Sequence, residues 1–123
     1  MVQPSDFFDE DAEGEADEIE AAGMVWIWHP SEGSGATSWF FLTIAGAAAE
    51  QVRERAPARR GGFGSVPVEA RIGATIWRTS LFPSREAGGY LLPLKVAVRR
   101  AEALVEGSAA TVVLRVGAHP GKA

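Results

Sequence analysis

The chain of 123 residues contains no cysteine. This absence excludes disulfide bonds, zinc sites with thiolate ligands and enzymes that use a cysteine nucleophile. Only two histidines are present, His29 and His119, and they lie far apart in the sequence. The nucleophile elbow, the P-loop and the metalloprotease motif H-E-x-x-H are also missing. We therefore predict no catalytic residues, no metal site and no cofactor, and we favour a binding protein over an enzyme.

Long apolar runs are missing as well. No stretch of about 18 apolar residues occurs, so we expect no membrane-spanning helix and no membrane partner. The N-terminus is acidic and lacks the basic and apolar segments of a secretory signal. A length of 123 residues suffices for one core but hardly for two. The expectation is a cytoplasmic single-domain protein that is a monomer or a weak dimer.

Basic residues are absent from the first 50 positions, which contain eleven acidic residues. All twelve basic residues and five acidic ones lie after position 50, so that part carries a net charge of +7. A charge asymmetry of this kind indicates either a surface that binds a polyanion or an acidic arm that covers a basic surface.

The chain divides into three parts by composition. Residues 1–18 are acidic with few apolar side chains, which predicts a disordered tail that either covers the basic surface or only aids solubility. Residues 19–117 are expected to form the folded domain, and residues 118–123 a flexible C-terminus.

The clearest local pattern is a β-hairpin. Over residues 66–72, an apolar set (Val66, Val68, Ala70 and Ile72) alternates with Pro67, Glu69 and Arg71, and Gly73-Ala74 fits a two-residue turn. This turn predicts a register in which Ala70 lies opposite Trp77 and Glu69 lies opposite Arg78. The second pair brings opposite charges together, which favours the same register.

Further strands are expected at residues 24–28, 37–44, 90–92 and 111–116, and a helix at residues 47–56. A second helix is predicted after Pro93 from an apolar stripe at helical spacing: Leu94, Ala97, Val98, Ala101 and Val105. Phe41-Leu42 and Tyr90-Leu91 are each followed by a helical segment. This internal echo suggests a barrel with a pseudo-twofold arrangement.

Three segments carry a family resemblance: Gly62–Val68 (GFGSVPV), Ile76–Pro83 (IWRTSLFP) and Tyr90–Arg99 (YLLPLKVAVR). With them, the chain resembles the small bacterial domains known as domain of unknown function 1905, from about Ile19 to Val116. The resemblance implies a mainly β fold, a split β-barrel of about six strands with two short helices. It implies no function.

A looser similarity links residues 90–95 and 101–107 to the half-barrel of transition-state regulators and antitoxins. Those proteins dimerise to complete a barrel and bind DNA through basic residues. Both halves lie in one chain here, so the usual reason for obligate dimerisation is absent.

The leading functional hypothesis is a basic face that binds an anionic ligand such as nucleic acid, because phosphate contacts require cations. The candidate residues are Arg59, Arg60, Arg78, Lys95, Arg99 and Arg100. Tyr90 and Phe63 are candidates for stacking on bases. The alternative interpretation of these cations is a solvated surface with local ion pairs.

A second hypothesis is a pocket inside the barrel that binds, and could convert, a small apolar molecule. Its candidate lining is Trp28, Ser65, Trp77, Ser80 and Tyr90. The other interpretation of the large aromatic residues (Trp26, Trp28, Trp39, Trp77 and Tyr90) is that they form the core. A third hypothesis is a protein-interaction module, which would present a bare apolar surface.

Overall fold

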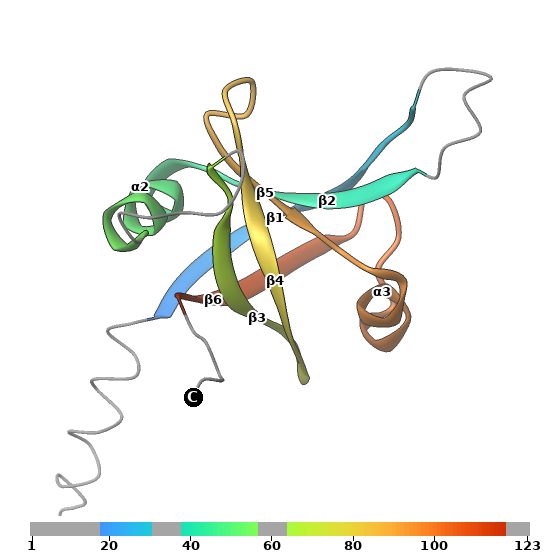
Figure 1. Ribbon diagram of the computed structural model, residues 1–123. Helices are drawn as coiled ribbons and strands as arrows, with labels where there is room; N and C mark the ends of the chain where they lie inside the picture. Colours follow the sequence, from blue (N-terminus) through green and yellow to red (C-terminus); the bar gives the residue numbers. More distant parts are fainter. Residues whose placement is uncertain (1–17, 31–37, 57–63, 118–123) are drawn as a thin grey trace, which may run out of the picture.

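The computed structural model describes residues 18–30, 38–56 and 64–117. The predicted disordered tail, except its last residue Glu18, and the predicted flexible C-terminus lie outside these ranges. The described residues form, in chain order, β1 (Glu18–Trp28), β2 (Trp39–Ile44), α2 (Gly46–Arg55), β3 (Val66–Ile72), β4 (Thr75–Ser84), β5 (Gly89–Pro93), α3 (Val96–Glu102) and β6 (Ala109–Val116). The predicted mainly β fold with six strands and two short helices is confirmed (Figure 1).

The strands close into an antiparallel barrel in the order β1-β2-β5-β4-β3-β6, in which β6 pairs with β1. The chain contains two equivalent units, β1-β2-α2-β3 and β4-β5-α3-β6. If β1, β2 and β3 are exchanged with β4, β5 and β6, every strand keeps equivalent neighbours in the barrel. The topology therefore has the internal twofold relation that the sequence echo predicted, and β2 and β5 pair across the axis.

The β3–β4 hairpin has the predicted register. Ile72 pairs with Thr75, Ala70 with Trp77 and Glu69 with Arg78. Gly73 has a φ of +59°, a conformation that suits glycine in this turn. Among the described residues the only ion pair within 4.0 Å joins Arg53 to Glu50, so Glu69 and Arg78 are paired across the strands without forming an ion pair.

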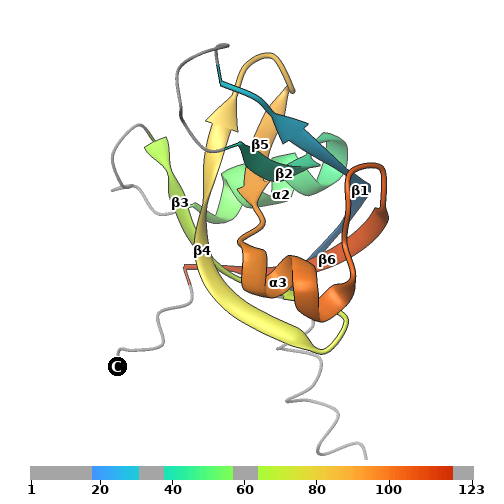
Figure 2. The same cartoon turned by 90° about the vertical axis from the view of Figure 1, so that its right-hand side faces the viewer.

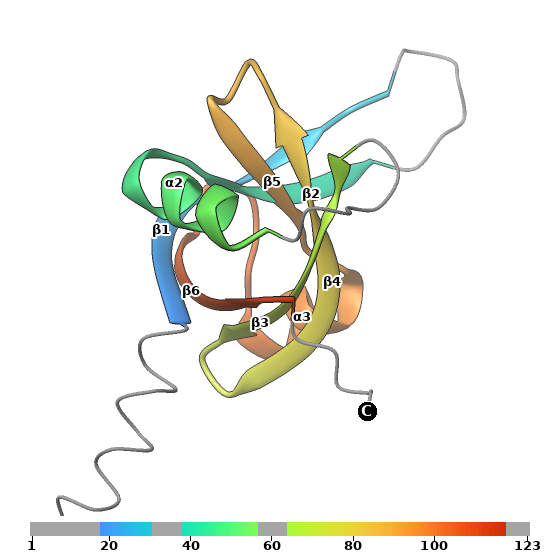
Figure 3. The same ribbon diagram turned by 60° about the vertical axis from the view of Figure 1, so that its left-hand side comes forward.

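The barrel interior is filled by aliphatic side chains from alternate strand positions. Those almost fully buried include Ile19, Leu42, Leu81, Leu92, Val112 and Leu114. Removal of this apolar surface from water, at roughly 25 cal/mol per Å², is the main source of stability. The two helices lie on opposite sides of the barrel, with α2 against β1 and β5 and α3 against β4 (Figures 2 and 3). Neither described helix has the length and apolar character needed to cross a membrane.

The predicted stripe of the second helix is wrong in part. α3 begins at Val96 and ends at Glu102, because Ala103 adopts the left-handed conformation with a φ of 55°. This change of direction turns Leu104 into the core and leaves Val105 65% exposed. Ala97 and Ala101 are exposed, whereas Leu94 and Val98 are buried as predicted.

Candidate ligand-binding face

Large aromatic side chains lie on the outer face of β1 and β2. On β1 the buried side chain of Val25 fixes the inward face, and Trp26 and Trp28 project outward. On β2 the buried Leu42 does the same, so Trp39 and Phe41 project outward. Trp28 is 48% exposed and Trp39 is 51% exposed.

The alternative interpretation of the aromatic residues as core is therefore wrong for Trp28 and Trp39. It is correct for Trp77 and Tyr90, which are buried. The reason lies in β1 and β2, whose residues are apolar on both faces over 24–28 and 39–42. A period of two places Trp26 and Trp28 on the same face of the strand, but it does not determine which face meets the core.

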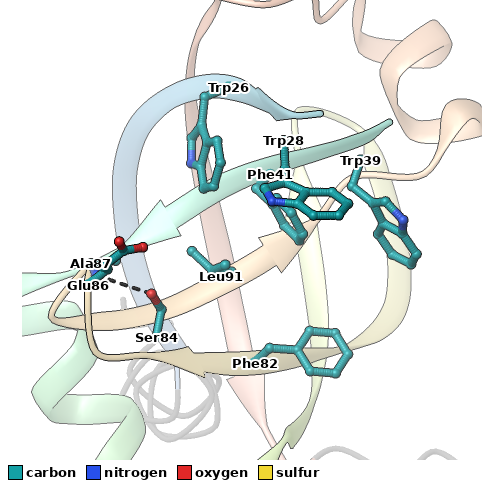
Figure 4. A pocket seen from close by; sticks show the side chains of 9 residues that line it. All are labelled: Trp26, Trp28, Trp39, Phe41, Phe82, Ser84, Glu86, Ala87 and Leu91. Carbon is teal, nitrogen blue, oxygen red and sulfur yellow. Dashed lines mark hydrogen bonds between the residues drawn. The ribbon is translucent and has the colours of Figure 1, made fainter. Parts of the chain in front are cut away.

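These side chains line an open groove of about 590 Å³, which we call the aromatic groove (Figure 4). Strand pairing brings its residues together, because Trp26 lies opposite Phe41, Trp28 opposite Trp39, and Phe82 of β4 opposite Leu91 of β5. The complete lining is Trp26, Trp28, Trp39, Phe41, Phe82, Ser84, Glu86, Ala87 and Leu91.

The rings of the aromatic groove are held in place by their neighbours. The indole N–H of Trp26 donates a hydrogen bond of 2.8 Å to Thr43 Oγ1. The centroids of Trp26 and Phe41 lie 5.2 Å apart, and those of Trp39 and Phe41 lie 6.1 Å apart with nearly parallel planes. Such a fixed array offers flat apolar surfaces at a low cost in side-chain entropy.

A second hollow of about 570 Å³ adjoins the aromatic groove and shares Trp39 and Phe82 with it. We call it the cationic hollow, because Arg78 of β4 and Lys95 lie in its wall. Its lining is Trp39, Trp77, Arg78, Thr79, Ser80, Phe82, Pro93 and Lys95. A smaller third hollow of about 150 Å³ contains Trp39, Lys95 and Arg99 among its residues.

Arg99 in the third hollow has a fixed position. Its Nε–H donates a hydrogen bond of 3.0 Å to the carbonyl of Leu94, and its guanidinium carbon lies 3.7 Å from the centroid of the Phe40 ring. The amide N–H of Leu94 in turn donates to the carbonyl of Phe40 at 2.9 Å. No described carboxylate lies within 4.0 Å of Arg78, Lys95 or Arg99. Within the described residues, these three cations therefore have no ion-pair partner.

The structure divides the predicted basic face. Arg78 and Lys95 share the cationic hollow, and Lys95 and Arg99 share the third hollow. Arg100 is exposed on α3 and lines none of the three hollows. Arg59 and Arg60 lie outside the described residues.

The predicted pocket residues are also divided. Trp28 lines the aromatic groove, whereas Trp77 and Ser80 line the cationic hollow. Ser65 and Tyr90 are buried and line none of the three hollows. The five residues are thus spread over two hollows and buried positions, so the predicted lining does not describe one site.

Sequence reasoning missed six residues of the aromatic groove: Phe41, Phe82, Ser84, Glu86, Ala87 and Leu91. It also assigned Trp26 and Trp39 only to the core. One signal was available, because Trp26 and Trp28, like Trp39 and Phe41, are two positions apart and so share a strand face. The position of Glu86 depends on the conformation of the β4–β5 turn, and no sequence motif predicts that conformation.

Groups typical of catalysis are sparse in the part of the chain that is described. No cluster of three or more His, Cys, Asp or Glu residues suited to a metal ion occurs there. His29 Nδ1 and the Ser38 hydroxyl lie 3.3 Å apart at an exposed position. No third group orients this pair among the described residues, so the geometry is that of a surface hydrogen bond.

Comparison with known proteins adds the family. The model of the family described as "Domain of unknown function (DUF1905)" matches residues 23–114, which include all six strands in whole or in part and both helices. No curated protein and no solved structure matches the chain. The looser similarity to transition-state regulators and antitoxins therefore stays a prediction. Because the match covers most of its length, the chain belongs to the family DUF1905.

Proposed function

We propose that the outer face of β1, β2, β5 and β4 binds single-stranded nucleic acid. One observation carries this proposal: Trp39 lines the aromatic groove and also both hollows that contain Arg78, Lys95 and Arg99. A single-stranded nucleic acid has the matching chemistry, because flat bases alternate with anionic phosphates along its length.

The aromatic groove supplies the apolar part of this interaction. Stacking of a base on an exposed aromatic side chain contributes about 1–3 kcal/mol per base. Trp28 and Trp39 are each about half exposed and already ordered by their pairing across β1 and β2. Little conformational entropy is therefore lost when a base stacks on them.

The cations next to Trp39 supply the polar part. Arg99 is held by Leu94 and Phe40, so its guanidinium is positioned before a phosphate arrives. Lys95 lies between the cationic hollow and the third hollow and lines both. Each phosphate neutralised by these groups releases counterions, which makes the affinity fall as salt rises.

Single strands fit this face better than duplexes. The stacking surfaces of bases in a duplex are covered by neighbouring bases and cannot contact Trp28 or Trp39. Side chains reach base faces only where the bases are unstacked. We therefore expect duplexes of equal length to bind only through their phosphates, and more weakly.

The test is fluorescence anisotropy of a labelled 12-nucleotide single strand and its duplex, over a series of salt concentrations. Trp39→Ala should weaken single-strand binding about tenfold at low salt. Lys95→Gln should weaken it and reduce the slope against log salt by about one. Val105→Ala and Arg115→Gln alter an exposed apolar residue and an exposed cation elsewhere on the barrel, and should leave binding unchanged. Absence of single-strand binding at low salt would contradict the proposal.

A second candidate function is the binding of a small aromatic molecule in the aromatic groove. It is favoured by the lining of that groove, in which only Ser84 and Glu86 are polar or charged. Such binding would depend on Trp39 but would hardly change with salt or with Lys95→Gln. The same variants therefore separate the two functions. Loss of all nucleic-acid binding with intact folding would leave this candidate and a protein partner.

A further inference from the structure

The charges around the aromatic groove are distributed unequally. Glu86 is the only charged residue in its lining, and it lies at the β4–β5 turn together with Ser84. Figure 4 shows Glu86 and Ser84 at one end of the groove, with Trp39 and the ring of Phe82 at the other. Trp39 and Phe82 also line the cationic hollow with Arg78 and Lys95. A ligand along the groove thus has a carboxylate at one end and cations at the other.

The β4–β5 turn holds Ser84 and Glu86 in a defined arrangement. The amide N–H of Ala87 donates a hydrogen bond of 3.1 Å to Ser84 Oγ, and the amide N–H of Gly88 donates one of 3.1 Å to the carbonyl of Arg85. Because Ser84 Oγ accepts the bond from Ala87, its own hydroxyl proton remains available for a ligand. The end of the groove therefore offers one donor, from Ser84, beside one anionic acceptor, from Glu86.

This donor and acceptor match the edge of particular bases. Cytosine and adenine each carry an exocyclic amino group next to a ring nitrogen that accepts a hydrogen bond. Thymine and uracil carry no amino group, and their ring N–H lies between two carbonyl oxygens. A carboxylate that accepts from this N–H therefore lies close to two oxygens that repel it. A carboxylate accepts from the cytosine amino group but repels a carbonyl oxygen, and it also repels phosphate. The base edge would thus lie at Glu86 and the phosphate at Lys95 and Arg78.

We propose that Glu86, assisted by Ser84, makes the aromatic groove select cytosine and adenine over thymine and uracil. This inference rests on the proposed binding of single-stranded nucleic acid and adds its base preference. Glu86 is here a specificity-determining residue: it decides which base is accepted, while the aromatic rings and the cations provide most of the affinity.

The experiment compares two labelled 12-nucleotide strands, all cytosine and all thymine, by anisotropy titration at pH 7.5 and fixed salt. The natural chain should bind the cytosine strand about five- to tenfold more tightly. Glu86→Gln should reduce this ratio to within twofold of one, because the amide has lost the anionic acceptor and presents a donor to thymine O4. The matched control is Glu106→Gln, which removes an exposed carboxylate outside the groove and should leave the ratio unchanged.

The outcomes separate this inference from the proposed function. Binding of both strands with no preference, or a preference that survives Glu86→Gln, would overturn the role of Glu86 and leave the proposed function standing. Binding of neither strand would overturn both. A fall in the ratio for Glu106→Gln equal to that for Glu86→Gln would show a general charge effect and would also overturn the inference.

Discussion

The guanidinium carbon of Arg99 lies 3.7 Å from the centroid of the Phe40 ring, while its Nε–H is hydrogen-bonded to Leu94. Phe40 is on β2 and Arg99 is on α3, so this contact joins the helix to the sheet beside Trp39. A cation over an aromatic face contributes about 0.5–1 kcal/mol at partly exposed sites. The contact also fixes where this positive charge lies.

Arg99→Lys tests whether this position matters. The substitution keeps the charge but loses the planar group that both stacks on Phe40 and donates to Leu94. We expect about three- to fivefold weaker binding of a single-stranded 12-mer, with a stability loss of about 1 kcal/mol. Arg100→Lys on the same helix is the control and should change neither quantity. No effect of Arg99→Lys would show that only the charge counts. An equal loss for both substitutions would show that the contact with Phe40 is not the cause.

Two tryptophans that line the cationic hollow should differ sharply in their effect on stability. Trp77 is 8% exposed and packs in the core, so Trp77→Ala should lower the free energy of unfolding by about 3–5 kcal/mol. Trp39 is 51% exposed, so Trp39→Ala should cost about 1 kcal/mol or less. Urea unfolding followed by circular dichroism measures both. A large loss for Trp39→Ala would assign this residue to the core and weaken its assignment to a binding face.

Gly89 should not tolerate a side chain. A Cβ at this position would collide with the backbone carbonyl oxygen of Ile44, where β5 passes the start of α2. Gly89→Ala should therefore destabilise the barrel by about 3 kcal/mol or more. Gly88→Ala is the comparison, because its Cβ meets nothing within 4 Å but its φ of +71° carries a cost of about 1 kcal/mol. Thermal unfolding of the two variants gives the difference, and a similar Tm for both would contradict this prediction.

The hydrogen bond between Thr75 Oγ1 and Glu102 Oε2, 2.6 Å long, connects the β3–β4 turn to the end of α3. Because the acceptor is a carboxylate in a half-buried position, Thr75→Val should cost about 1–2 kcal/mol of stability. Thr111→Val on the exposed side of β6 serves as the control and should change stability by less than about 0.5 kcal/mol. Chemical denaturation measures both values. An unchanged midpoint for Thr75→Val would show that water replaces the bond at no cost.

The fold was predictable where the sequence is locally unambiguous. In β3, buried apolar side chains such as Val66 and Val68 alternate strictly with less buried ones, and Gly73 marks the turn, so both the hairpin and its register follow. The end of α3 could not be predicted, because it depends on Ala103 in a left-handed conformation that alanine rarely adopts. That single residue decides that Leu104, and not Val105, is buried.

The candidate face was predictable only in part. Lys95, Arg78 and Arg99 were identified from charge, and barrel closure brings them around Trp39. The aromatic groove was missed because residues 24–28 of β1 and 39–42 of β2 are apolar on both faces, and only the completed barrel decides which face meets water. Glu86 was missed because its relation to Trp28 is set by strands that are distant in the sequence.

The order of strands around the barrel has a consequence for how the chain folds. β3 belongs to the first unit, yet both of its neighbours, β4 and β6, belong to the second. β6 belongs to the second unit and lies between β3 and β1 of the first. The last strand of each unit thus pairs with strands of the other unit, and neither unit can form a closed core alone. Such interlocked halves leave no stable half-folded form, so the barrel should assemble in one slow cooperative step governed by distant contacts.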